Sequence, residues 1–204
     1  MLTIGITGGI GCGKSLLVRM IQEGCEYPCI CIDTDSIAKS LMEPGEVSYC
    51  LIKKHFGDVV IGDDGRIDSK ELSKIVMSDE KQLKILNEFT HPYVIKAVKQ
   101  ILNEHKEEDG IAVIESALLL DTHLYKVCDE VWNVTASIEK RIERLCNYRG
   151  YTKERAYSII NNQHDSNWYK EHSTRTFLND ADGGRDMREV LNIFLKTYSS
   201  KHKV

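Results

Sequence analysis

Short runs of apolar residues alternate with longer stretches of helical period along the chain. The apolar runs have strand length, contain β-branched residues and end at glycine or at polar residues. They fall at residues 2–7, 29–33, 110–120, 130–136 and 176–180. Strands that alternate with helices predict an α/β fold built on a doubly wound parallel sheet of about five strands. Ligands of such sheets bind at the carboxyl ends of the strands.

Residues 46–108 differ from the rest of the chain, because four amphipathic stretches follow one another there without a strand-like run. These stretches cover residues 48–57, 69–77, 80–89 and 93–106. His91 and Pro92 separate the last two, and Pro92 suits the first turn of a new helix. We therefore expect one domain over residues 1–204. Its parts are a core (1–45 and 109–136), a helical lobe (46–108), a lid region (137–170) and a C-terminal strand and helix (171–204).

Local sequence signals add detail to four elements of this prediction. The run 29–33 contains only apolar residues and cysteine before its final aspartate, which favours a buried strand. Gly24 suits the position just after a helix over residues 14–23. Asp35 and Thr152 are suitable N-caps for helices that begin at residues 36 and 153.

Composition and charge narrow the class of protein. The chain is 42% hydrophobic and 28% charged, as soluble globular proteins are, and its formal net charge of −4 disfavours a nucleic-acid-binding protein. Seven cysteines without a CxxC pair favour reduced thiols rather than disulfides or a zinc site. Neither a signal peptide nor an apolar run of bilayer length is evident. We expect a cytoplasmic protein that binds neither a membrane nor nucleic acid.

The stretch GITGGIGCGKS contains the pattern GxxxxGK[ST] between the first predicted strand and the following helix. Its glycines let successive N–H groups turn toward an anion, and the helix adds its positive end. In this pattern the lysine reaches the β- and γ-phosphates and the serine hydroxyl ligates Mg²⁺. We therefore predict that ATP and Mg²⁺ bind here, with Ser15 as the metal ligand. The predicted nucleotide contacts in this loop are Gly8, Gly9, Ile10, Gly11, Cys12, Gly13, Lys14, Ser15 and Leu16.

A phosphate loop alone does not identify the reaction. The chain has no NKxD motif for guanine and is short for a motor or transporter ATPase, which favours a small-molecule kinase. Asp33 and Asp35 stand at the end of the second predicted strand, beside the phosphate loop if the two strands are neighbours. A carboxylate there would orient an attacking hydroxyl and accept its proton. In the alternative interpretation Asp35 only caps a helix and Asp33 only fills a turn.

The order of these motifs resembles that of the dephospho-coenzyme A kinases. TGGIGCGKS, CIDTDSIAK, HFGDVVIGDDGRID, THPYV, ESALLLD and RLCNYRG follow one another over about residues 1–195. The resemblance implies transfer of phosphate from ATP to the ribose 3′-hydroxyl of dephospho-CoA. It implies Asp35 as the base, Lys14 as the stabiliser of the transferring group, and the helical lobe as the acceptor site. Asp33 and His91 would contact the acceptor, although His91 also fits a helix start beside Pro92.

The resemblance places an arginine-bearing lid after the fourth strand. Arg141 and Arg144 lie three residues apart on one helix face, and we assign Arg144 to ATP and Arg141 to the substrate. Alternatively, they form a solvated charged face with Glu139 and Glu143. Asn179 matches a turn near the adenine, where either Asn179 or Asp180 would touch the base.

Several positions depart from the family pattern. Ala117 and Asp121 replace a proline and a glutamate, and Ser69 and Tyr148 stand where arginines are expected. Another nucleoside or nucleotide kinase, or an ATP-binding protein with reduced catalysis, therefore stays open as an alternative. We expect a monomer or a weak homo-oligomer.

Cys12 places a thiol inside the phosphate loop. We hypothesise that nearby cations and the helix N-terminus lower its pKa, so that thiol modification blocks ATP binding. Alternatively, Cys12 is a tolerated small residue.

Overall fold

The computed structural model describes residues 1–202 and divides into two compact units. We call Met1–Ile32 with Lys106–Val204 the core unit, and Asp33–His105 the helical unit.

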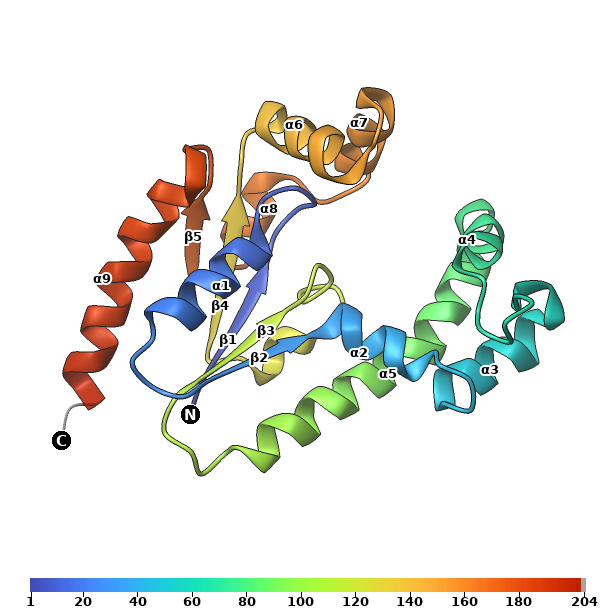
Figure 1. Ribbon diagram of the computed structural model, residues 1–204, viewed down its shortest axis with the longest axis horizontal. Helices are drawn as coiled ribbons and strands as arrows, with labels where there is room; N and C mark the ends of the chain where they lie inside the picture. The colour runs from blue at the N-terminus through green and yellow to red at the C-terminus, as the bar shows by residue number, and fades with distance from the viewer. Residues whose placement is uncertain (203–204) are drawn as a thin grey trace. The chain divides into compact units, whose positions relative to one another are not determined.

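The core unit is built on a five-stranded parallel sheet (Figure 1). Its strand order is β2-β3-β1-β4-β5, so β1 lies at the centre. The strands are β1 (Leu2–Thr7), β2 (Cys29–Asp33), β3 (Ile111–Glu115), β4 (Glu130–Thr135) and β5 (Arg175–Leu178). The predicted doubly wound sheet of about five strands is confirmed. Only Ile111–Glu115 of the predicted run 110–120 form a strand, because turns begin at Ala117.

The second strand differs from its prediction. β2 lies at the edge of the sheet, with β3 between it and β1. Only Ile32 is buried in this strand, whereas Cys31 is exposed. The strand that the sequence predicts at residues 29–33 is confirmed, but its predicted burial is wrong, and β2 is not a direct neighbour of β1.

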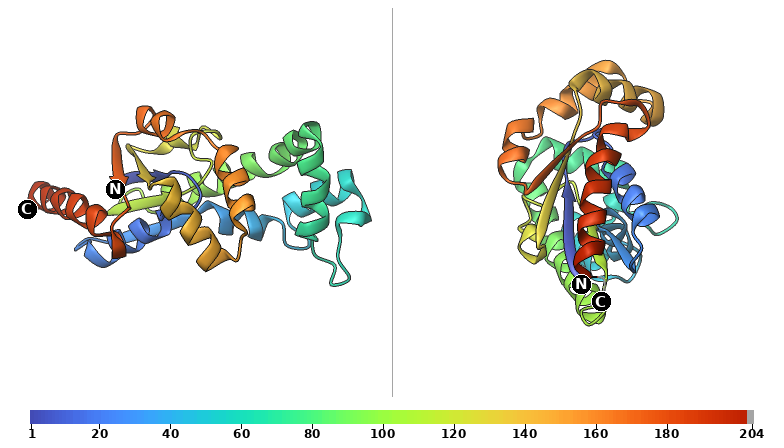
Figure 2. Two further views of the ribbon diagram at one scale, coloured as in Figure 1. Left: turned by 90° about the horizontal axis from the view of Figure 1, so that it is seen from above. Right: turned by 90° about the vertical axis from the view of Figure 1, so that its left-hand side faces the viewer.

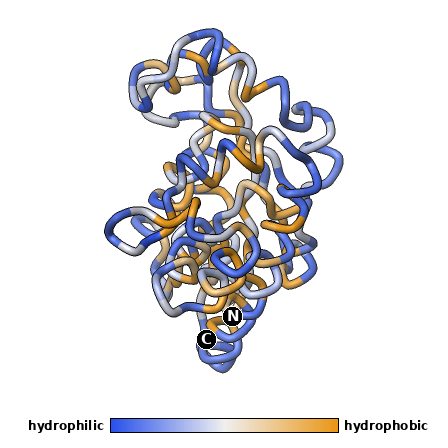
Figure 3. Tube along the Cα trace, turned by 90° about the vertical axis from the view of Figure 1, so that its right-hand side faces the viewer, coloured by the Kyte–Doolittle hydropathy of each residue, from blue (hydrophilic) through white to orange (hydrophobic). Residues whose placement is uncertain are grey.

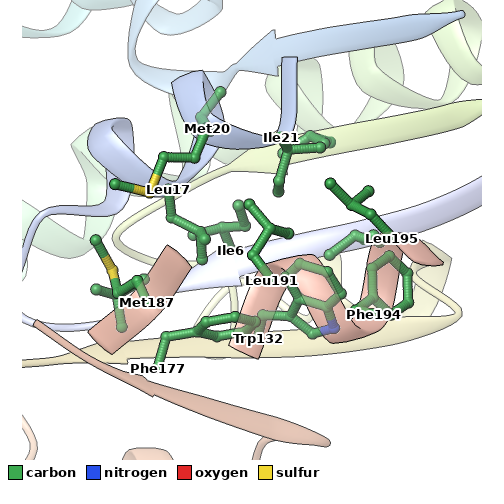
Figure 4. Packing of buried hydrophobic residues seen from close by; sticks show 14 of the residues in the cluster. Ile6, Leu17, Met20, Ile21, Trp132, Phe177, Met187, Leu191, Phe194 and Leu195 are labelled. Atoms are coloured by element: carbon green, nitrogen blue, oxygen red, sulfur yellow. The ribbon is translucent and has the colours of Figure 1, made fainter. Parts of the chain in front are cut away.

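Helices α1 (Lys14–Gly24) and α9 (Arg185–His202) pack together on one face of the sheet. Figure 4 shows Leu17 and Ile21 of α1 directed toward Leu191 of α9, with Trp132 of β4 between the sheet and α9. All four of these side chains are at most 2% exposed. The helical periodicity of both segments thus produces the core, because their apolar positions fall on the faces that meet.

Helices α6 (Ile138–Arg149) and α7 (Lys153–Asn161) lie toward the carboxyl ends of the strands (Figure 1). The core unit also contains α8 (Ser166–Glu171), a 3₁₀ turn at Leu124–Val127 that precedes β4, and another at Asp182–Gly184. The Thr152 cap is confirmed, since its side chain accepts a hydrogen bond from the N–H of Arg155. Helix α8 was not predicted. Gly24 is the last residue of α1 rather than the residue after it, so that prediction is wrong by one position.

The helical unit is arranged around one long helix, α5 (Glu80–Glu104) (Figure 2). Its other elements are α2 (Thr34–Leu41), α3 (Val47–Phe56), a 3₁₀ turn (Asp58–Val60) and α4 (Ser69–Ser78). Helices α2, α3 and α4 all contact α5. Ile52, Val60, Leu72 and Val76 form the centre of a separate small core, with Phe89 packed against them.

Helix α5 runs without a break through Pro92. The predicted helix start at His91 and Pro92 is therefore wrong, and the two amphipathic stretches on either side form one helix. A proline inside a helix removes one N–H donor and pushes against the preceding turn. Near this proline, Ser48 Oγ donates to Phe89 O at 2.8 Å, and Thr90 Oγ1 donates to Leu86 O at 3.0 Å.

Hydrophobic and hydrophilic stretches alternate at short intervals along the chain (Figure 3). Within residues 1–202, none of the helices combines the length and the apolar character that crossing a bilayer requires.

Candidate active site

The loop between β1 and α1 has the geometry that its glycines predict. Gly8 has φ +134° and Gly13 has φ +99°, conformations that side chains with a Cβ rarely adopt. A Cβ on Gly8 would collide with the carbonyl oxygen of Val134, and one on Gly13 with the side-chain amide of Asn179. Both glycines are thus required by their conformation and by close packing.

Asn179 and Arg144 bind the backbone of this loop. Asn179 follows β5 and is 1% exposed, and its Nδ2 donates to Cys12 O at 2.7 Å. Arg144 of α6 donates from Nη2 to Asn179 O at 2.7 Å and from Nη1 to Gly11 O at 3.3 Å. Helix α6 and the segment after β5 therefore both hold the backbone of the loop, and the guanidinium group of Arg144 lies beside it.

Arg141 forms a second link from α6 to the loop. Arg141 is 6% exposed, and its Nε donates to Ile10 O at 2.8 Å. Gln163 Oε1 accepts both from Arg141 Nη2 at 2.8 Å and from Ile10 N at 2.9 Å. The buried side chain contradicts the alternative of a solvated charged face. Glu143 instead pairs with Lys140 at 3.2 Å.

Lys14 and Ser15 are the first two residues of α1. Lys14 Nζ donates to Gly8 O at 3.0 Å and to Gly9 O at 3.4 Å. Ser15 Oγ donates to Glu115 Oε1 at 2.7 Å. Glu115 is the last residue of β3 and lies opposite Ile6 of β1.

Glu115 was missed by our reasoning from the sequence. The available signal was an acidic residue at the end of an apolar strand, in ESALLL. A hydroxyl and a carboxylate 2.7 Å apart are hard oxygen donors, which suit Mg²⁺. Among residues 1–202, no three His, Cys, Asp or Glu side chains converge to hold a metal. This donor set fits a Mg²⁺ ion that takes its other ligands from phosphate and water.

Cys12 does not have the reactive environment that we hypothesised. Its side chain is 3% exposed, and burial raises the pKa of its thiol above the ordinary value. Arg141, Lys14 and Arg144 act in the opposite direction but do not outweigh burial. The expected lowering of this pKa is therefore wrong, because desolvation disfavours the thiolate.

The N-cap of helix α2 is Asp33 and not Asp35. Asp33 is the N-cap of α2: its carboxylate accepts from Asp35 N at 3.0 Å and from Ser36 Oγ at 2.6 Å. Asp35 lies in the first turn of the helix, so the interpretation of Asp35 as its N-cap is wrong. Asp35 and His91, which lies inside α5, both belong to the helical unit.

Three of the four positions that depart from the family pattern have the following surroundings in the structure. Ser69 begins α4, which is capped by Asp68, and Tyr148 is 83% exposed at the end of α6. Asp121 Oδ1 lies 3.0 Å from His164 Nε2.

Asp180, the alternative to Asn179 for contact with the base, has a structural hydrogen bond. Its Oδ1 accepts from Ser137 N at 2.7 Å, so the carboxylate connects the end of β5 to the start of α6.

Comparisons with known proteins identify a family for this chain. A sequence model of the dephospho-CoA kinase family matches residues 2–183. The dephospho-CoA kinase of Carboxydothermus hydrogenoformans is 34% identical over 162 residues, which cover 78% of this chain and 77% of the relative.

Two solved structures extend the likeness over nearly the whole chain. The protein TT1252 of Thermus thermophilus has a TM-score of 0.78 at 25% identity, covering 96% of this chain and 97% of that one. A dephospho-CoA kinase from Campylobacter jejuni has a TM-score of 0.65 at 20% identity, covering 96% and 98%. At the lower identity the likeness concerns the fold.

Proposed function

Because the chain belongs to the dephospho-CoA kinase family, we propose that it phosphorylates the ribose 3′-hydroxyl of dephospho-CoA. The donor is ATP, and the products are coenzyme A and ADP. The observation that carries this proposal is the family match over residues 2–183, which includes the complete phosphate loop. The kinase family implies ATP, whereas the acceptor and the metal ion are parts of the proposal.

On the donor side, the N–H groups of residues 8–16 and the start of α1 bind the phosphates of ATP. Lys14 moves from the carbonyls of Gly8 and Gly9 to the β- and γ-phosphates. Arg144 and Arg141 add positive charge beside the loop, which favours the charge distribution of the transition state. Asn179 binds the loop at the carbonyl of Cys12, and the chain around Asn179 contacts the adenine base of ATP.

Mg²⁺ is bound through Ser15 and Glu115, whose oxygens fit its preference. When bound, the ion neutralises charge on the phosphate oxygens.

On the acceptor side, Asp35 orients the 3′-hydroxyl of the ribose and accepts its proton. The oxygen then attacks the γ-phosphorus, and the bond from that phosphorus to the β-phosphate oxygen breaks to release ADP. Asp33 caps α2 and so fixes the turn that carries Asp35. The helical unit, including His91, supplies the remaining contacts to the acceptor. The location of the enzyme in the cytoplasm and its monomeric or weakly oligomeric state belong to the same proposal.

An acceptor assay tests this function. Purified protein receives ATP and Mg²⁺ with dephospho-CoA, adenosine or AMP, and ADP release is measured by a coupled assay. We expect turnover only with dephospho-CoA and a product that matches authentic coenzyme A in mass and chromatographic retention. The matched control is Lys14→Ala, which should abolish transfer.

Two results would replace the proposal by the alternatives. Turnover with adenosine or AMP but not with dephospho-CoA would identify a nucleoside or nucleotide kinase. ATP binding without turnover on any acceptor would identify a protein with reduced catalysis.

A further inference from the structure

Two polar side chains are buried beneath the start of the phosphate loop without a hydrogen-bond partner. Asn133 of β4 is 1% exposed and Thr7 of β1 is 0% exposed. Asn133 Nδ2, Asn133 Oδ1 and Thr7 Oγ1 have no partner among the atoms of the described residues. Buried polar groups of native proteins are almost always paired, because an unpaired group loses its hydration. An amide unpaired at both ends therefore needs an explanation.

The position of Asn133 connects this amide to the loop. Asn133 pairs with Thr7 in the parallel register of β4 and β1, so both side chains emerge on the same side of the sheet. The next residue after Thr7 is Gly8, the first glycine of the loop. A Cβ on Gly8 would lie 3.2 Å from Asn133 Oδ1. The unpaired amide is thus packed against the Gly8 peptide.

The carbonyl of Gly8 already accepts a hydrogen bond from a different side chain. Lys14 Nζ donates to Gly8 O at 3.0 Å, and in the proposed function this ammonium group moves to the phosphates. The Gly8 carbonyl then loses a charged donor at a buried position. Losing the donor of a buried carbonyl is unfavourable unless another donor replaces it.

We propose that Asn133 is a positioning residue of the phosphate loop, and that its side-chain amide becomes the hydrogen-bond partner of the Gly8 peptide when Lys14 binds nucleotide. The inference rests on the proposed binding of ATP. It explains why an amide stands among apolar residues in the stretch VWNV of β4. Asn133 does not touch the nucleotide in this proposal, and it acts only through the backbone of the loop.

The test compares Asn133→Val with Asn133→Thr, two substitutions of equal shape that differ by one hydroxyl group. Binding of the non-hydrolysable analogue adenylyl-imidodiphosphate with Mg²⁺ is measured by calorimetry, and Tm is measured without nucleotide. We expect Asn133→Val to weaken binding roughly tenfold, the equivalent of one buried hydrogen bond. Its Tm without nucleotide should stay equal or rise, because an unpaired amide has been removed. Asn133→Thr should recover part of the affinity, because its hydroxyl can donate.

The matched control is Thr3→Val, which removes a buried hydroxyl at the other end of β1. It should bind the analogue as the parent protein does. The proposal is overturned if Asn133→Val binds the analogue with unchanged affinity. It is also overturned if Asn133→Val melts clearly lower without nucleotide or does not fold, because the amide would then be satisfied already in the free protein. If the parent protein itself fails to bind the analogue, the proposed function fails first and this inference falls with it.

Discussion

The arginines beside the phosphate loop have a different role from the one that their local sequence suggests. Arg141 and Arg144 are three residues apart. This spacing fits an exposed face of a helix, and it fits equally well two side chains that bind the same segment. The structure directs both guanidinium groups to carbonyl oxygens of the loop. The contacts come from residues more than 100 positions away in the sequence, so local charge pairing gave no indication of them.

Cys12 leads to a prediction about thiol reactivity. Because burial raises its pKa, the thiolate is scarce at pH 8, and the side chain is also inaccessible. In the native protein, iodoacetamide at pH 8 should label Cys12 far more slowly than the exposed Cys31 and Cys50. The rate at Cys12 should rise with pH only above the ordinary range of thiol pKa values.

Peptide mass spectrometry after timed quenching measures each site separately, with the unfolded protein as the control for intrinsic reactivity. Labelling of Cys12 as fast as that of Cys50 at pH 8 would contradict this account.

At the scale of elements, two departures from the sequence pattern have identifiable physical causes. The apolar run 29–33 is an edge strand, because apolar content does not determine which strands flank it. Helix α5 continues through Pro92, and hydroxyls of Ser48 and Thr90 donate to carbonyls of this helix nearby. Helix propensity alone predicts a break at the proline. The structure shows an unbroken helix there, with a tertiary contact from Ser48 close to the proline.

The contact of Ser48 with α5 predicts a stability effect. Ser48 is 0% exposed, and Ser48→Ala would leave the carbonyl of Phe89 without this donor. We expect a loss of about 0.5–1.5 kcal/mol in the free energy of unfolding, the net contribution of one hydrogen bond. Urea denaturation followed by circular dichroism measures it.

Ser78→Ala is the matched control, since the exposed Ser78 hydroxyl donates to Ile75 O within α4. Its effect should stay within about 0.5 kcal/mol. Equal stabilities of the two variants would show that the Ser48 contact does not support the proline turn.

At the scale of the whole molecule, the proposed reaction draws on two units. The phosphate loop, its arginines and Glu115 belong to the core unit, whereas Asp35 belongs to the helical unit. The proposal therefore assigns nucleotide binding and proton acceptance to different units of the chain.

Asp35→Asn should separate these functions. The substitution removes the base but leaves the Asp33 cap and the whole core unit unchanged. We expect kcat to fall by about 10²–10⁴-fold, while the Kd of ATP stays within about twofold. Turnover with dephospho-CoA and calorimetry with ATP are the two measurements.

Asp63→Asn, in an exposed turn of the same unit, is the control and should keep full activity. Near-normal turnover of Asp35→Asn would remove Asp35 from the role of base.

The sequence by itself determined the α/β class, the strands around the sheet centre and the phosphate loop with Lys14 and Ser15. These features depend on short-range patterns: apolar runs of strand length, helical period, and glycines at fixed spacing. The order of motifs along the chain also indicated the family.

Only the tertiary structure decided what surrounds the loop. The edge position of β2, the contact of Glu115 with Ser15, the links from Arg141, Gln163 and Asn179, and the unpaired amide of Asn133 all join distant segments. Local patterns do not specify such pairings, because they arise from strand order and from the packing of loops onto the sheet. The same packing raised the pKa of Cys12, where the sequence suggested only nearby positive charge.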